Sequence, residues 1–93
     1  MTKHTIDISC TGPTPEDTTV TNGDKVTFDN TTGASVTITF DTPGVFNPSP
    51  GGSITIAKDG TKKLNVGKIK DGTCFSYPDC EAALGTRSGR IDP

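Results

Sequence analysis

Three cysteines and one histidine are the side chains of this sequence with the widest range of chemistry. Cys10, Cys74 and Cys80 can form a disulfide, bind a soft metal ion or act as nucleophiles, and His4 carries the single imidazole. These are the ligand types that zinc prefers, but no two of the cysteines have the close CxxC spacing of recognisable zinc sites. The spacing therefore predicts no metal site.

His4 is the one residue of this sequence with a suitable pKa to act as a base in nucleophilic catalysis. A serine or cysteine nucleophile needs a neighbouring base, and we expect the imidazole of His4 to be exposed near the N-terminus. The carboxylates are scattered through predicted turns, and the pair Asp79 and Glu81 is more typical of a solvated loop than of an acid/base couple. We predict no enzymatic activity, no catalytic residue and no cofactor.

The pairing of the three cysteines is left open by their spacing. Three different disulfides can be drawn, and the odd number leaves at least one thiol free in a monomer. In a reducing compartment, all three would instead be small, buried apolar side chains.

The composition of the chain argues against two classes of partner and bears on its cellular compartment. Nine basic and eleven acidic residues give a net charge of −2 and no basic stripe, so we expect no nucleic-acid partner. No apolar run approaches the ~18 residues of a membrane span, so we expect no membrane partner. The first ten residues alternate in polarity and lack the apolar core of a signal peptide. We therefore expect a cytoplasmic location, unless a leader has been removed.

The elements that must position these side chains are strands. Seventeen threonines accompany mainly β-branched and aromatic apolar residues, which favours strands over helices. Apolar side chains at every second position predict strands at 4–10, 24–30 and 35–41. Asn22-Gly23 predicts the tight turn before the second of them.

The rest of the chain alternates turns with short strands. Residues 11–17 and 42–53 are rich in proline, so we expect the first to be a surface loop and the second to be a connection or a sheet edge. Further strands are predicted around Ile54, Leu64 and Phe75, with a short last one at Ile91. The chain of 93 residues is too short for two cores, so residues 1–93 are predicted to form one domain. The predicted fold is all-β: a Greek-key antiparallel β-sandwich of about seven or eight short strands.

Inward-facing side chains follow from the same alternation. The predicted core consists of Ile6, Ile8, Val26, Phe28, Val36, Ile38, Phe40, Ile54, Ile56, Leu64, Val66, Phe75 and Ile91.

The order of these segments resembles the cupredoxins. Residues 20–30 (VTNGDKVTFDN) are similar to the cupredoxin Gly-Asp turn and the apolar strand that ends in Asn. Residues 36–40 (VTITF) resemble the next strand, residues 71–77 the strand that enters the copper loop, and residues 89–91 its exit. The resemblance covers nearly the whole chain and implies a cupredoxin-like sandwich.

The blue-copper ligands of that family are missing. A type 1 site needs two imidazoles and a thiolate, usually with an axial thioether, and this chain has one His and one Met, both near the N-terminus. The resemblance places the first ligand histidine at Val36 or the neighbouring Ser35. Aligning Tyr77 with the aromatic residue before the ligand cysteine fills the other positions with Pro78 for the cysteine, Glu81 for the second histidine and Arg87 near the methionine.

The resemblance also bears on the cysteines. It implies that Cys10 and Cys80 lie at the same end of the sandwich, so a disulfide can join them, while a Cys74–Cys80 bridge competes. Cys80 could instead take the place of the ligand cysteine if the loop is shifted by two residues, although no shift supplies an imidazole. A bridge that closes the loop from Cys10 to Cys80 would contribute about 4 kcal/mol.

The function that these observations favour is that of a non-enzymatic binding or structural module without a functional type 1 copper site. Its predicted contact surface lies at the end that copper occupies in the family, formed by the 33–36 turn and the 43–52 and 78–88 loops. The apolar residues expected there are Phe46, Ala82, Ala83 and Leu84. Residues 82–84 fit equally well a short helical turn packed on the sandwich. A protein partner or a second copy of the chain would bind there.

The alternative function is a copper- or zinc-binding protein with a non-standard Cys/His site, and a small enzyme ranks last.

Overall fold

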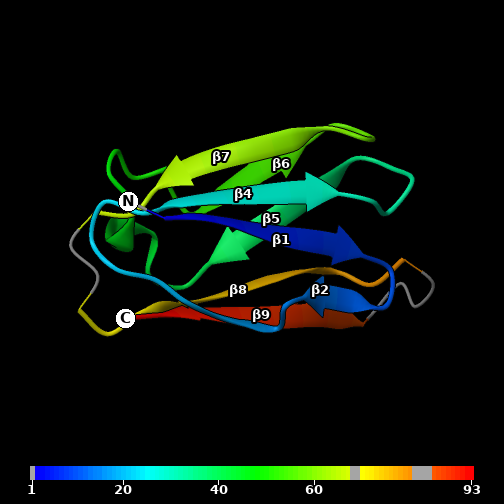
Figure 1. The fold of residues 1–93 in the computed structure, drawn as a ribbon. Coiled ribbons are helices and arrows are strands. Elements are labelled where there is room, and N and C mark those ends of the chain that lie inside the picture. The colour runs from blue at the N-terminus through cyan, green and yellow to red at the C-terminus, as the bar shows by residue number, and fades with distance from the viewer. Residues whose placement is uncertain (1, 68–69, 81–84) are drawn as a thin grey trace.

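The fold consists of two β-sheets packed face to face (Figure 1). The computed structural model describes residues 2–67, 70–80 and 85–93. Within these residues there are nine strands: β1 Lys3–Ser9, β2 Gly12–Thr14, β3 Asp17–Thr19, β4 Lys25–Asn30, β5 Val36–Phe40, β6 Ser53–Ile56, β7 Thr61–Asn65, β8 Thr73–Pro78 and β9 Thr86–Asp92. A single 3-10 turn, η1, spans Pro43–Val45. None of the described segments forms a helix with the length and apolarity that crossing a membrane requires.

Each sheet draws on both halves of the chain. One sheet has the order β2-β1-β4-β7, and the other has the order β3-β9-β8-β5-β6. β1, β4, β6 and β8 run toward one end of the sandwich, while β5, β7 and β9 return toward the other. The chain therefore crosses between sheets several times, and each sheet face contributes side chains to one shared core.

The predicted core is confirmed. All thirteen side chains expected to point inward are buried, and Ile6, Phe28 and Ile38 have no exposed surface at all. Four further apolar side chains complete the cluster: Val20, Val45, Phe46 and Tyr77. Phe28 lies at its centre, because its ring packs edge-on against Phe40 and Phe75 at centroid distances of 5.8 and 5.4 Å.

The predicted sandwich is confirmed, but its sheets are mixed and not purely antiparallel. β1 runs parallel to β4, with Ile6 opposite Phe28, and β3 runs parallel to β9, with Thr18 opposite Ile91. Parallel neighbours require a long crossover between them. The segment from Cys10 to Asp24 supplies it, because β3 pairs with the other sheet before the chain returns to β4.

Residues 11–17 contain strand structure that the sequence did not predict. β2 pairs with β1 and β3 with β9, and each stands at the edge of its sheet. Proline is tolerated at an edge because one side of the strand makes no ladder hydrogen bonds. Pro13 therefore fits within β2, opposite Ile8. These two strands raise the number from the expected seven or eight to nine in the described residues.

The last strand is also longer than the short strand expected at Ile91. β9 pairs with β8 from Thr86 to Ile91, and Gly89 lies opposite Phe75 on the buried face. A Cβ at Gly89 would lie 2.5 Å from Cζ of Phe75 and 2.7 Å from the carbonyl oxygen of Glu16. The Phe75 ring occupies the space that a side chain at position 89 would need. The strand therefore has glycine at an inward position where the alternating pattern would show an apolar residue.

Gly89→Ala should destabilise the protein by about 1–3 kcal/mol, because the new methyl group collides with the Phe75 ring and with backbone. Gly44→Ala is the matched control, since a Cβ there meets no atom within 4 Å. The free energy of unfolding measured in urea should change by less than about 0.5 kcal/mol for this control. Equal effects of the two substitutions would contradict the tight packing of β9 on Phe75.

Candidate functional site

A disulfide joins the two sheets at one end of the sandwich. Cys10 follows β1 and Cys80 follows β8, and their sulfur atoms are bonded at 2.05 Å with the Cα atoms 5.2 Å apart. We call this end, where β1, β4 and β8 finish, the disulfide end. The Cys10–Cys80 pairing is confirmed, and Cys74 remains a free thiol.

A buried tyrosine reinforces the same junction. The hydroxyl of Tyr77 donates a hydrogen bond of 2.9 Å to the carbonyl oxygen of Ser9, so β8 is tied to β1 immediately beside the disulfide. Tyr77 is only 2% exposed, and this burial raises the pKa of its phenol. The phenol is therefore a neutral donor that fixes the two strand ends.

The turns of the disulfide end are organised by one buried amide. Asn30 ends β4 and donates to the carbonyl oxygens of Ala34, Ile56 and Ala57 at 2.8, 3.0 and 3.1 Å. Its carbonyl oxygen accepts bonds from the backbone N–H and the hydroxyl of Thr32, at 3.0 and 2.7 Å. Asn30 thus fixes both the 31–35 turn and the turn after β6.

A surface hollow of about 370 Å³ lies between the 31–35 turn and the end of β8. One wall is the segment Thr32–Thr37, and the other is Pro78, Asp79 and the disulfide-bonded Cys80. Beyond the hollow, Arg87 Nε lies 3.2 Å from a carboxylate oxygen of Asp79. The hollow combines backbone, hydroxyl groups and apolar surface, and its one carboxylate is paired.

Solved structures of one copper protein share this architecture. An oxidised variant of amicyanin superposes with a TM-score of 0.64 at 15% identity, and the alignment covers 97% of this chain and 80% of amicyanin. Two variants in the Cu(I) form give the same TM-score and coverage at 16% and 17% identity. The chain has the cupredoxin fold. No protein-family model and no curated protein sequence matches it.

The residues present do not fit the copper site that this fold implies. Around the hollow, the expected ligand positions carry the hydroxyl of Ser35, the buried methyl groups of Val36 and the ring of Pro78. The sulfur atom of Cys80 is bonded to that of Cys10 in the disulfide, so it is not a thiolate ligand. Arg87, which the resemblance places near the methionine ligand, is a cation paired with Asp79 and cannot act as a ligand. Among the described residues, no three His, Cys, Asp or Glu side chains form a group that could hold a metal ion.

The segments of the predicted contact surface lie at two opposite ends of the sandwich. The 33–36 turn and the start of the 78–88 loop meet at the disulfide end, but the 43–52 segment follows β5 to the opposite end. Phe46 is 2% exposed there, and its ring packs edge-on against Phe40 at 5.2 Å. Its expected place in an exposed patch is therefore wrong. Ala82, Ala83 and Leu84 lie outside the described residues.

His4 is also far from the disulfide. It lies near the start of β1, six residues from Cys10, or about 20 Å along an extended strand. Its Nε2 is 2.9 Å from Oδ2 of Asp24. The same carboxylate accepts the backbone N–H of Thr2 at Oδ1 and that of Thr21 at Oδ2, both at 3.0 Å. These donors, the Thr2 N–H first, hold the pKa of Asp24 well below its usual range. The imidazole, expected to be exposed, is half-buried in a structural cluster.

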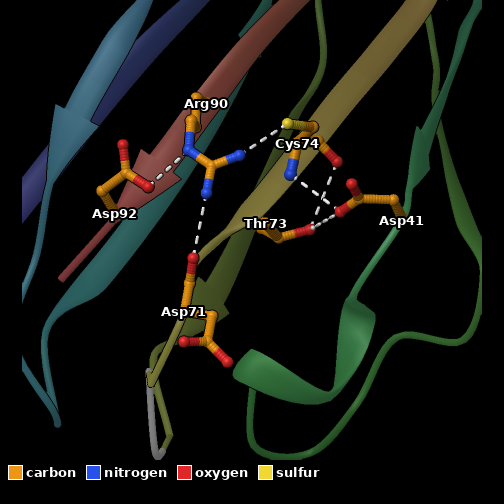
Figure 2. A network of polar contacts seen from close by, with 6 residues as sticks. All are labelled: Asp41, Asp71, Thr73, Cys74, Arg90 and Asp92. Atoms are coloured by element: carbon orange, nitrogen blue, oxygen red, sulfur yellow. Dashed lines mark hydrogen bonds and ion pairs between the residues drawn. The ribbon is translucent and has the colours of Figure 1, made fainter.

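The free thiol of Cys74 belongs to a polar network on the outer face of the five-stranded sheet (Figure 2). Arg90 donates to Cys74 Sγ at 2.9 Å, to an Asp92 carboxylate oxygen at 2.6 Å and to the Asp71 carbonyl oxygen at 3.0 Å. The carboxylate of Asp41 accepts the Cys74 N–H at 2.8 Å, and this bond is the main cause of its lowered pKa.

Sequence reasoning missed Arg90, because two of its partners, Cys74 on β8 and Asp71 in a turn, are distant from it in the sequence. The bond to Asp92, with the bond to Cys74 second, raises the pKa of the Arg90 guanidinium. The group that contacts the thiol sulfur is the Arg90 guanidinium, which is a donor, and the carboxylates of Asp41 and Asp92 accept N–H or O–H groups. The network therefore fastens the start of β8 to β9 and supplies no base for the thiol.

Cys80→Ser should lower the melting temperature by roughly 15–30 °C under oxidising conditions, since the bridge that spans 70 residues is lost. Under reducing conditions, the wild type should melt close to the variant. Cys74→Ser is the matched control, and its melting temperature should change little in either condition. An equal loss for Cys80→Ser in both conditions would assign Cys80 a packing role in place of the cross-link.

The same bridge should be visible by mass spectrometry. Alkylation under denaturing but non-reducing conditions should label one cysteine, Cys74.

Asp24 should make stability depend on acid pH. Its pKa is lower in the folded protein than the ordinary 3.8, so its contribution is complete above that value and is lost as the pH falls below it. Asp24→Asn should therefore be less stable than the wild type near neutral pH, and the difference should shrink below about pH 4. Urea unfolding across this range measures it, with the exposed Asp17→Asn as control. A difference that does not change with pH would contradict this account.

Proposed function

We propose that this chain is a non-enzymatic binding or structural module, built on a cupredoxin fold without a functional type 1 copper site. The observation that carries the proposal is the Cys10–Cys80 disulfide. A thiolate is the ligand that a blue copper centre cannot do without, and the cysteine nearest to that position is bonded to another strand. The loop end is held by a covalent cross-link, a role that needs no metal.

The binding surface of this module is the disulfide end. Its hollow lies between two turns that Asn30 and the disulfide hold in place, and loops on such a rigid scaffold are suited to bind a partner. The apolar segment 82–84 continues the chain beyond Cys80 and remains our predicted contact for a protein partner.

A non-standard copper or zinc site is the alternative, and the placement of the ligands argues against it. His4 and Cys10 are separated by about 20 Å of strand, and Cys74 and Cys80 by a similar length of β8. Two of the three thiols become available only after the disulfide is reduced.

A copper titration tests the proposal. With Cu(II), the oxidised protein should show no intense absorption near about 600 nm, because it lacks the two-imidazole, one-thiolate set. The same titration after reduction of the disulfide should also show none. His4→Ala is the control for adventitious binding through the single imidazole. An intense blue band with one copper per chain, in either redox state, would overturn the proposal.

A further inference from the structure

The outer face of the four-stranded sheet separates positive from negative charge. On its two central strands, every second side chain points away from the core. From one end of the face to the other, the rows across β1 and β4 are Lys3 with Lys25, Thr5 with Thr27, and Asp7 with Asp29. On these two strands, one end of the face is therefore cationic, the middle row is neutral and the other end is anionic.

This arrangement pairs like charges across the strands. Lys3 is the direct neighbour of Lys25, and Asp7 is the direct neighbour of Asp29. Like charges at directly opposed positions destabilise a sheet, whereas opposite charges there stabilise it. Exchanging Lys25 with Asp29 would convert both rows into attractive pairs. These like-charged neighbours carry an electrostatic cost that no ion pair among the described residues offsets.

The two charged rows are also too far apart to neutralise each other. Four residues along a strand correspond to about 13 Å, which exceeds the Debye length of about 8 Å at physiological salt. Of the ion pairs formed among the described residues, none involves any of these four side chains. Within the described part of the chain, these four charges are therefore open to opposite charges of another molecule.

We propose that this face docks on the same face of a second copy of the chain. A two-fold axis that lies in the face, perpendicular to β1 and β4, and passes through the Thr5–Thr27 row reverses the strand direction. It places Lys3 over Asp7 of the second copy and Lys25 over Asp29 of the second copy. Each of the four unfavourable neighbours in one chain then meets an opposite charge, and the symmetry repeats every contact.

The sizes of the side chains suit this geometry. Face-to-face sheets pack about 10 Å apart, a distance that a lysine and an aspartate span together. Thr5 and Thr27 are short and neutral, so they allow close approach at the axis. Lys63 is in the same row, opposite Thr27, but it lies on the edge strand β7 and is exposed. Its flexible side chain can reach water beyond the edge, which avoids repulsion from its own copy.

The dimer should be weak and sensitive to salt. The contact area is at the low end of protein interfaces, and its contacts are charged and polar. Its Kd should therefore be on the order of 100 µM at low salt. This inference rests on the outer sheet face and goes beyond the proposed function, so the copper titration and the measurement of association can fail independently.

Sedimentation equilibrium of the oxidised protein tests the dimer. The wild type should associate at about 20 mM salt and weaken at least tenfold at about 500 mM salt. The lysine-face variant (Asp7→Lys with Asp29→Lys) and the aspartate-face variant (Lys3→Asp with Lys25→Asp) should each be monomeric, because every contact across the axis becomes repulsive. An equimolar mixture of the two should form a heterodimer.

The control for net charge is the variant that carries all four substitutions. It reverses both ends of the face, keeps the net charge of the wild type and should dimerise as the wild type does. Glu16→Lys with Asp17→Lys changes net charge as the lysine-face variant does, but on and beside β3 of the other sheet, and should leave the dimer intact. Circular dichroism confirms that each variant is folded. As a single substitution, Thr5→Lys should weaken the dimer, because it brings two cations together at the axis.

Three results would overturn the inference. The first is a wild type that stays monomeric to about 1 mM at low salt, well above the expected Kd. The second is a dimer that the lysine-face and aspartate-face variants retain. The third is a loss of association in the four-substitution variant while it remains folded.

Discussion

The covalent bond between Cys10 and Cys80 is the constraint on which one whole end of this molecule depends. It joins the finish of β1 in one sheet to the finish of β8 in the other, across 70 residues of sequence. Tyr77 adds a hydrogen bond between the same two strands, and Asn30 arranges the turns around them. A chain with few large apolar side chains gains relatively much from such a cross-link, which restricts the unfolded state by about 4 kcal/mol.

A disulfide and a metal centre can both hold the loop after Tyr77 at this end of the cupredoxin fold. The resemblance implies a ligand near Val36 and the others in the loop after Tyr77, so a metal would tie turn and loop together. In this chain, the loop is tied through Cys80 to β1, while the turn is held by the amide of Asn30. The described turn and strand ends are therefore fixed here although Ser35, Val36 and Pro78 offer no ligand set.

The parts of this structure that could be predicted from the sequence were those with a local signal. Alternation places Val26 and Phe28 in the core because the period of a strand is a local property. The partner of a strand is not a local property, so neither segment contains a sequence pattern that indicates the parallel pairing of β1 with β4. Gly89 concealed most of β9, since its buried face is filled by the Phe75 ring from β8. Phe46 was misplaced because its proline-rich surroundings indicate a surface loop, whereas the ring turns inward onto Phe40.

The carboxylates of this protein fall into two groups that differ in where their charge is balanced. Asp24 and Asp41 accept backbone N–H groups, and those bonds lower their pKa values, so their charge is used to fix chain segments. Asp7 and Asp29 have neighbours of the same sign on the open face of a sheet. A charge that is balanced inside the fold stabilises it. Asp24, for example, holds the N-terminal segment through its bonds to Thr2 and His4. A charge that the fold leaves opposed by its own kind lowers stability instead. In the dimer that we propose, an opposite charge of the second copy balances each of these charges.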